Sequence, residues 1–250
     1  MKILALDSSG LVASVAVVEN ETLLAEYTVN YKKTHSQTLL PMLDEISNMT
    51  ELDLSTIDAI AVSGGPGSFT GLRIGSATAK GLGLALDKPL ISIPTTAAIA
   101  YNIWDTDKFV CPIMDARRNQ VYAGLYCYTD HHLDTIWEQD ALSIEALAEG
   151  LNCLDHEVIF LGDGVAVYRE KLEALLTIPF SFAPAHVNRQ RAAAVGALAE
   201  VYYKEGKIQT AEEHEPEYLR KSQAERERAE RESVKHADVV KKQENGERNE

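Results

Sequence analysis

Alternating apolar and β-branched residues open the chain and predict three consecutive strands, at 2–7, 11–18 and 22–29. Polar residues at 8–10 and 19–21 supply the turns between them. A helix is expected next, because Leu39, Leu40, Met42, Leu43, Ile46 and Met49 recur at helical spacing. Residues 34–37 have the spacing of a capping box, and Pro41 predicts that the helix bends or starts late.

The same order of elements is expected to occur twice along the chain. The first half continues with a strand at 59–63, a glycine-rich loop, a helix at 72–86, a strand at 89–93 and a helix from Thr95. The second half predicts strands at 109–115, 121–128 and 133–138, a helix at 144–151, a strand at 158–161, and helices at 165–176 and 191–205. Asp7 and Asp115 each stand at a strand end before a turn and another apolar strand, which indicates an internal duplication. We therefore expect an α/β protein with lobes at 1–106 and 107–221.

The last 29 residues differ in composition from the rest of the chain. The segment 222–250 contains eight acidic and seven basic residues and very few apolar ones. Such a segment cannot bury enough apolar surface to fold alone, so it predicts a charged tail that is disordered or a lone helix.

Composition and charge exclude several classes of protein. A chain of 250 residues with 45% hydrophobic residues can form one large or two modest cores, and no apolar run approaches the roughly 20 residues of a membrane span. An acidic residue at position 7 interrupts the apolar N-terminus, which argues against a secretory signal and predicts a cytoplasmic protein. The net charge of −14 argues against binding nucleic acid without a basic partner.

The glycine-rich loop is the most distinctive segment. Gly64, Gly65 and Gly67 follow a strand, and Ser68 can cap the helix after them, which suits an anion such as phosphate. The loop has neither the Walker pattern nor the dinucleotide-binding pattern. A tight turn that binds no ligand explains it equally well.

Two further turns could belong to a nucleotide site. Asp7, with Ser8 and Ser9, and Asp115 could hold a magnesium–phosphate group through water, and Gly162, Asp163 and Gly164 could lie beside adenine or ribose. Each is also an ordinary turn. ATP or ADP with Mg²⁺ is thus an open cofactor assignment. No histidine pair has helical metal-site spacing, and no nucleophile elbow occurs, so no catalytic residue is assigned.

A stripe of small residues follows the loop. Gly71, Gly75, Ala79 and Gly83 recur every fourth residue of the predicted helix. Either the stripe packs on the protein's own sheet, or it forms a subunit interface with neighbouring apolar residues. The interface interpretation adds four residues of the preceding helix and one of the same helix, namely Leu39, Met42, Leu43, Ile46 and Leu82.

Several motifs together resemble the TsaB (YeaZ) family. They are Ile3-Leu-Ala-Leu-Asp-Ser-Ser, Thr34-His-Ser-Gln-Thr-Leu-Leu-Pro, Gly64-Gly-Pro-Gly-Ser-Phe-Thr-Gly-Leu-Arg-Ile-Gly, Ala79-Lys-Gly-Leu, Met114-Asp-Ala-Arg-Arg, Val121-Tyr and Tyr218-Leu-Arg. The resemblance runs to Arg220 and implies an actin/hexokinase/Hsp70-like (ASKHA) fold of two duplicated lobes. It also implies a role in bacterial synthesis of threonylcarbamoyladenosine beside the tRNA anticodon.

The resemblance further implies a subunit without catalytic residues of its own. The catalytic relative TsaD has a histidine metal pair after its glycine loop, whereas this chain has Pro94-Thr-Thr-Ala-Ala-Ile-Ala. The implied partners are TsaD and other components of that machinery, with a homodimer when alone, tRNA contact only through the complex, and no membrane. The alternative is an active small-molecule kinase or ATPase of the same fold that uses Asp7 and Asp115. The missing nucleophile elbow and metal pair argue against a peptidase.

Overall fold

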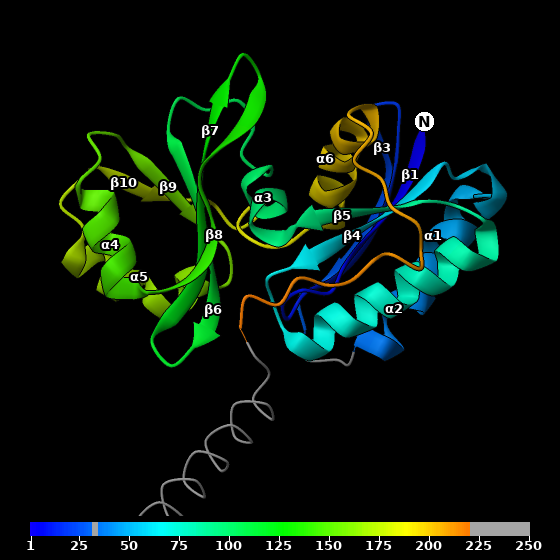
Figure 1. The fold of residues 1–250 in the computed structure, drawn as a ribbon, viewed down its shortest axis with the longest axis horizontal. Helices are drawn as coiled ribbons and strands as arrows, with labels where there is room; N and C mark the ends of the chain where they lie inside the picture. Colours follow the sequence, from blue (N-terminus) through cyan, green and yellow to red (C-terminus); the bar gives the residue numbers. More distant parts are fainter. Residues whose placement is uncertain (32–34, 221–250) are drawn as a thin grey trace, which may run out of the picture. The chain divides into compact units, whose positions relative to one another are not determined.

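The computed structural model describes residues 1–31 and 35–220 (Figure 1). Contacts divide the chain into two compact units, 1–218 and 219–250, and the architecture below is that of the first. The predicted charged tail at 222–250 and the first residue of the predicted capping box, Thr34, lie outside the described residues.

The first sheet has the strand order β3-β2-β1-β4-β5. Its strands are β1 (Lys2–Asp7), β2 (Ala13–Glu19), β3 (Thr22–Val29), β4 (Ala59–Gly65) and β5 (Leu90–Pro94). The first three pair antiparallel, whereas β4 and β5 run parallel to β1. Because side chains alternate along β1, Leu4 and Leu6 join one apolar core, while Ile3 and Ala5 join another on the opposite face.

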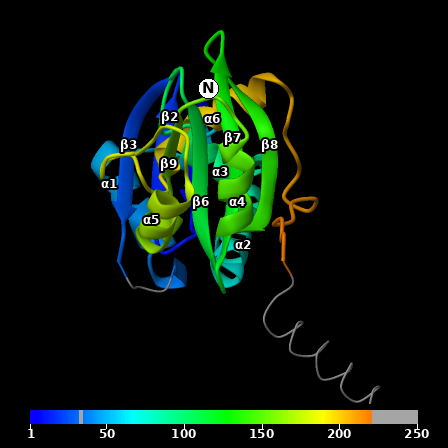
Figure 2. The same ribbon diagram turned by 90° about the vertical axis from the view of Figure 1, so that its left-hand side faces the viewer.

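Two helices cover one face of this sheet and a third covers the other. Helices α1 (Leu39–Thr50) and α2 (Phe69–Leu86) bury Met42, Leu43 and Ala79 against the Leu4 side. Helix α6 (Ala192–Lys204), from the far end of the chain, packs on β1 and β2 from the Ile3 side (Figures 1 and 2). Short 3₁₀ turns, His35–Gln37 and Leu54–Thr56, flank α1.

The second sheet repeats the order of the first, with β10-β9-β6-β7-β8. Its strands are β6 (Phe109–Arg117), β7 (Gln120–Thr129), β8 (His132–Ser143), β9 (Val158–Leu161) and β10 (Phe180–Phe182). Helices α4 (Ile144–Asn152) and α5 (Gly164–Leu175) bury a third core against it. The short helix α3 (Thr95–Ala100) is buried along its whole length and contacts both sheets. The predicted α/β duplication into two sheet-based lobes is confirmed, while the boundary at 106/107 stays a prediction.

The structure corrects the start of one predicted helix, agrees with the start of another and adds a short strand. Helix α2 begins at Phe69 rather than Leu72, because the Ser68 side chain accepts a hydrogen bond from the Gly71 N–H and caps it. Helix α1 begins late, as predicted, with Pro41 in the first turn, where a missing N–H costs nothing. The three-residue strand β10 was not expected from the sequence, because it is too short to show alternation.

After α6 the chain returns along α2 in a segment that we call the strap, residues 209–218. Gln209 forms an antiparallel bridge with Leu90 at the edge of β5, with N···O distances of 2.9 and 2.8 Å. The Lys80 ammonium donates to the carbonyls of Glu212 and His214, at 3.3 and 2.9 Å. The strap thereby covers the edge of the first sheet and one flank of α2.

Within the described ranges 1–31 and 35–220, no helix combines the length and apolar character needed to cross a bilayer.

Candidate functional site

Asp7 ends β1 as a completely buried carboxylate. Its Oδ1 atom accepts from the Ser9 N–H at 2.9 Å and from the Ser9 hydroxyl at 2.7 Å. Its Oδ2 atom accepts from the Ser63 hydroxyl at 2.6 Å. Burial raises the pKa of Asp7 above its ordinary value, although the hydrogen bonds from Ser63 and Ser9 oppose that shift.

The glycine-rich loop is pressed onto the turn that follows Asp7. The Ser68 N–H donates to the Ser9 carbonyl at 2.6 Å, and the Ser8 hydroxyl donates to the Gly71 carbonyl at 2.8 Å. A Cβ atom on Gly67 would lie 2.3 Å from the Ser9 carbonyl oxygen, and one on Gly71 would lie 2.1 Å from that of Ser8. Glycine is required here because two segments of the protein's own backbone approach each other closely.

Two other segments meet the beginning of the loop. The Glu217 N–H of the strap donates to the Gly64 carbonyl at 2.7 Å. The Gln139 amide of β8 donates to the Gly65 carbonyl at 3.1 Å and to the Glu217 carboxylate at 2.8 Å. The Thr96 hydroxyl of α3 in turn donates to Gln139 at 2.8 Å. Gln139 thus links the second sheet, α3, the strap and the loop, and no sequence pattern marks it for this role.

A segment before α6 contacts the candidate turns of both lobes. The Gly162 N–H donates to the Asn188 carbonyl at 3.0 Å. Two residues later, the Gln190 side chain is fully buried against Gly10, where an added Cβ would lie 2.6 Å from Nε2. Neither amide atom of Gln190 has a hydrogen-bond partner among the described residues. The segment 188–190 therefore touches a glycine turn of each lobe.

The second lobe holds the other candidate nucleotide residues. Asp115 accepts from the Arg117 N–H at 2.8 Å and from the Tyr168 hydroxyl at 3.3 Å, and it is half-buried. Asp163 lies close enough to Asp115 to interact with it, and burial raises the pKa of Asp163. Added Cβ atoms on Gly162 and Gly164, which flank Asp163, would lie 2.2 and 2.9 Å from the Ile113 carbonyl oxygen.

The predicted residues thus form two groups. The first contains Asp7, Ser8 and Ser9 with the loop residues Gly67 and Ser68, and Gly64 and Gly65 lie at its edge beside the strap. The second contains Asp115, Gly162, Asp163 and Gly164.

The predicted interface residues are placed inside the chain's own core. Leu39, Met42, Leu43 and Ile46 of α1 are at most 4% exposed, and Leu82 of α2 is half-buried. The small-residue stripe of Gly71, Gly75, Ala79 and Gly83 faces the first sheet, so a Cβ on Gly75 would lie 2.4 Å from the Ser8 hydroxyl. The sequence left two interpretations open, packing on the protein's own sheet and a subunit interface. In the structure these side chains pack inside the chain itself. The interface itself stays a prediction, and an interface on these helices would include their outward face, because an amphipathic helix buries only one stripe.

The outward face of α2 carries a second small-residue stripe that sequence analysis missed. Ala77 and Gly81 are exposed, and Leu84 is 60% exposed. At about 100° per residue these three positions share one side of the helix. A Cβ on Gly81 would have no neighbour within 4 Å.

Comparisons with known proteins decide the family. Residues 22–228 match the family model TsaD: tRNA N6-adenosine threonylcarbamoyltransferase. The tRNA threonylcarbamoyladenosine biosynthesis protein TsaB of Bacillus subtilis is 32% identical over 225 residues, which cover 90% of this chain and 96% of the relative. TsaB of Escherichia coli is 31% identical with the same coverage. This chain belongs to the TsaB family.

Solved structures agree with this assignment. YeaZ from Pseudomonas aeruginosa matches with a TM-score of 0.76 and 28% identity, over 87% of this chain and 99% of that one. Component A of Acidaminococcus fermentans (R)-2-hydroxyglutaryl-CoA dehydratase, at 12% identity, matches 83% of this chain and 100% of its own with a TM-score of 0.51, which shows the shared fold. The TsaB chain thus has the ASKHA fold that its sequence implied.

Proposed function

We propose that this TsaB chain is a non-catalytic subunit that supports TsaD in transferring the threonylcarbamoyl group to the tRNA adenosine beside the anticodon. The family assignment gives the process, the synthesis of tRNA threonylcarbamoyladenosine. The division of labour between this chain and TsaD is the proposed part.

The filled turn at Asp7 is the observation that carries the proposal. In a phosphate-binding turn, backbone N–H groups and a carboxylate must be open to the nucleotide or to its metal. Here the Ser68 N–H is directed at Ser9, and Asp7 is fully buried among hydroxyl and N–H donors. This packing supports the proposal that the turn does not bind phosphate. Its glycines then serve the close packing of two backbone segments.

The surface of this chain is better suited to bind a protein than a nucleic acid. The net charge of −14 repels phosphate, so tRNA would be held mainly by other components of the complex. The outward face of α2 offers Ala77 and Gly81, where another helix can approach closely. We place the contact with TsaD on this face, and the homodimer of the isolated chain uses the same face.

One observation favours the alternative function, an active kinase or ATPase. The Asp163 carboxylate has a buried oxygen, Oδ1, that lacks a hydrogen-bond partner among residues 1–31 and 35–220. It lies beside Asp115, so a nucleotide-bound cation could be attracted to this second turn. Under this alternative the isolated chain binds ATP and turns it over, and Asp115→Asn abolishes both properties.

Reconstitution tests the proposed function. We expect tRNA modification, measured by nucleoside mass spectrometry, to require both this chain and its TsaD, while the isolated chain shows ATP turnover well below about 1 s⁻¹. Full modification without this chain would contradict the proposal. ATP turnover at ordinary enzyme rates by the isolated chain would favour the alternative.

Interface variants test the surface separately. Gly81→Arg adds bulk and charge to the outward face of α2, where the monomer itself has open space. We expect a folded monomer that fails to bind TsaD and does not support modification, checked by sedimentation and circular dichroism. The matched control is Val167→Arg on the exposed surface of α5, which adds the same charged side chain and should leave binding unchanged. Normal complex formation by Gly81→Arg would place the interface elsewhere.

A further inference from the structure

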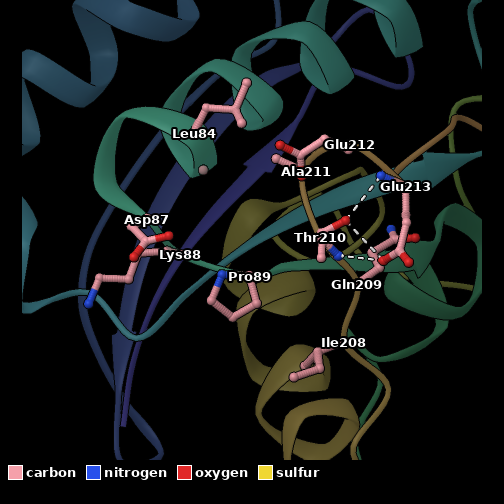
Figure 3. Close-up of a pocket in the computed structure, with 11 residues that line it drawn as sticks. Leu84, Asp87, Lys88, Pro89, Ile208, Gln209, Thr210, Ala211, Glu212 and Glu213 are labelled. Atoms are coloured by element: carbon pink, nitrogen blue, oxygen red, sulfur yellow. Dashed lines mark hydrogen bonds between the residues drawn. The ribbon is translucent and has the colours of Figure 1, made fainter.

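A groove lies where α2 ends and the strap begins (Figure 3). It has a volume of about 380 Å³ and is lined by the turn between α2 and β5 and by the first residues of the strap. The Gln209–Leu90 bridge joins its two sides, and Gly83 allows β5 to approach α2, because an added Cβ would lie 2.5 Å from Leu90 Cδ1. The groove is separate from both candidate nucleotide turns.

Its lining combines exposed apolar side chains with carboxylates. Leu84 is 60% exposed and Ile208 is 48% exposed, and Pro89 lies between them (Figure 3). Asp87 and Glu212 are both exposed at the same groove. Exposed apolar side chains at two places in one groove are suited to apolar side chains of a partner.

The charge of the groove is negative. Glu213 accepts from the Thr210 N–H and hydroxyl at 3.0 and 2.9 Å, which lowers its pKa and keeps it ionised. Together with Asp87 and Glu212 it opposes a single lining cation, Lys88, whose side chain extends away from the strap (Figure 3).

Neighbouring lysines of the described residues offset only part of this charge. Lys207 is paired with Glu205 at 2.7 Å. Lys80 donates to strap carbonyls and keeps its charge, so three carboxylates face two unpaired lysines, Lys80 and Lys88. The 18-residue helix α2 also ends here without a basic residue in its last turn, so its partial negative charge adds to that of the carboxylates.

We propose that this groove is a docking site for a basic, apolar polypeptide segment of a partner protein. Leucine-like side chains of the segment rest on Leu84 and on Ile208, and flanking lysine or arginine residues meet Asp87, Glu212 and the carboxyl end of α2. Charge complementarity selects this occupant over an acidic peptide or a nucleic acid. The site goes beyond the proposed function, and its test needs neither TsaD nor tRNA.

The test uses a fluorescein-labelled peptide of ten residues in which leucine alternates with lysine or arginine. With the full chain at low salt, we expect saturable binding by fluorescence anisotropy, weakened at high salt as exposed ion pairs are screened. The double variant Asp87→Lys/Glu212→Lys should weaken binding about tenfold or more. Leu84→Ser should weaken it about threefold or more, because the apolar contact shrinks.

A matched control comes from the other helix of the same face. Glu51 caps α1 in the same left-handed conformation as Asp87 caps α2, with φ of 51° and 54°. Glu45→Lys/Glu51→Lys changes the net charge of the protein equally, outside the groove, and should leave at least half of the affinity. Circular dichroism establishes that all variants are folded.

Three results would overturn the proposal. They are equal weakening by the α1 control, equally tight binding of a peptide in which serine replaces every leucine, and an absence of saturable binding. Competition by spermidine as effective as that by the unlabelled peptide would reassign the groove to small organic cations and would likewise contradict a polypeptide site.

Discussion

The two lobes repeat one topology but treat its key turn in opposite ways. In the first lobe the glycine-rich turn after β4 contacts the chain directly beyond Asp7, at Ser8 and Ser9, and the carboxylate is sealed. In the second lobe the glycines after β9 contact Ile113, two residues before Asp115, which remains half-buried.

The difference teaches that glycine alone does not determine whether the neighbouring aspartate is buried. The position of the backbone contact determines it. Both turns need glycine for close approach to a neighbouring backbone. Where the glycines contact the residues just after the aspartate, as at Asp7, the carboxylate is buried. Where they contact a residue before it, as at Asp115, the carboxylate stays half-buried. A duplicated motif can therefore keep its residues and lose its ligand site in one copy.

Adding a methyl group to each turn should give the largest effect. Gly71→Ala brings a Cβ to 2.1 Å from the Ser8 carbonyl oxygen and should lower the free energy of unfolding by about 3 kcal/mol in urea titrations. Gly164→Ala meets Ile113 at 2.9 Å and should cost about 1 kcal/mol.

The matched control is Gly81→Ala, which has open space in the same helix as Gly71 and should stabilise the protein by up to about 1 kcal/mol. Equal destabilisation by Gly71→Ala and Gly164→Ala would contradict the inference that the glycine contact is tighter in the first lobe.

Neutralising each aspartate should give a smaller effect. Asp7→Asn places an amide opposite the donors of Ser9 and Ser63, and we expect a loss of about 1–3 kcal/mol. Asp115→Asn, at a half-buried site, should change the free energy of unfolding by less than about 1 kcal/mol. Urea titrations of both variants at one pH compare the two lobes directly.

The pH dependence of the Asp7 effect has a definite sign. Because burial raises the pKa of folded Asp7 above the reference of 3.8, the folded state holds this proton more tightly than the unfolded state. The stability that Asp7 contributes is full below that reference and falls as the pH rises through the folded pKa. The cost of Asp7→Asn should therefore be largest in acid and decrease toward neutral pH. A cost that grows with pH would contradict the assignment.

The smallest expected effect is a change in the rate of thiol labelling. All three cysteines lie in the second lobe, so labelling measures the opening of that lobe alone. Cys153 is exposed, Cys127 is half-buried, and Cys111 is fully buried with its pKa raised by burial. We expect a thiol reagent to label them in that order, with Cys111 protected until the lobe opens. Gly164→Ala should accelerate labelling of Cys111 more than Gly71→Ala does, measured by mass spectrometry of digests. The reverse order of acceleration would mean that the lobes open as one unit.

Sequence patterns predicted most of the fold, because its inner strands are runs of apolar and β-branched residues and most of its helices bury one face. Alternation located β1 to β3, and helical spacing located α1 through Leu39, Met42, Leu43 and Ile46. The start of α2 was misplaced because Ser68 stands between the loop glycines and Gly71, so the loop-like composition continues into the first turn of the helix. A single sequence does not distinguish a stripe that packs on the protein's own sheet from one that packs on a partner, and this is why both interpretations of the stripe were open.

The candidate site was predictable in its parts but not in its assembly. Asp7 and the glycine loop were both singled out, and the structure brings them together. Gln139 and Gln190 were missed, because a lone glutamine acquires its role only from residues distant in sequence: Gly65 and Glu217 for the first, Gly10 for the second.

Helix α6 comes last among the helices described here, yet it covers the first sheet. Its Gly196 lies so close to β1 and β2 that a Cβ would meet Val18 at 2.7 Å and Ala5 at 3.3 Å. A ribosome must therefore synthesise nearly all of the described chain before the first sheet can bury its second face. Until then Ile3, Ala5 and Ala16 have no permanent cover, so a nascent chain stalled before residue 192 should need a chaperone to stay free of aggregation.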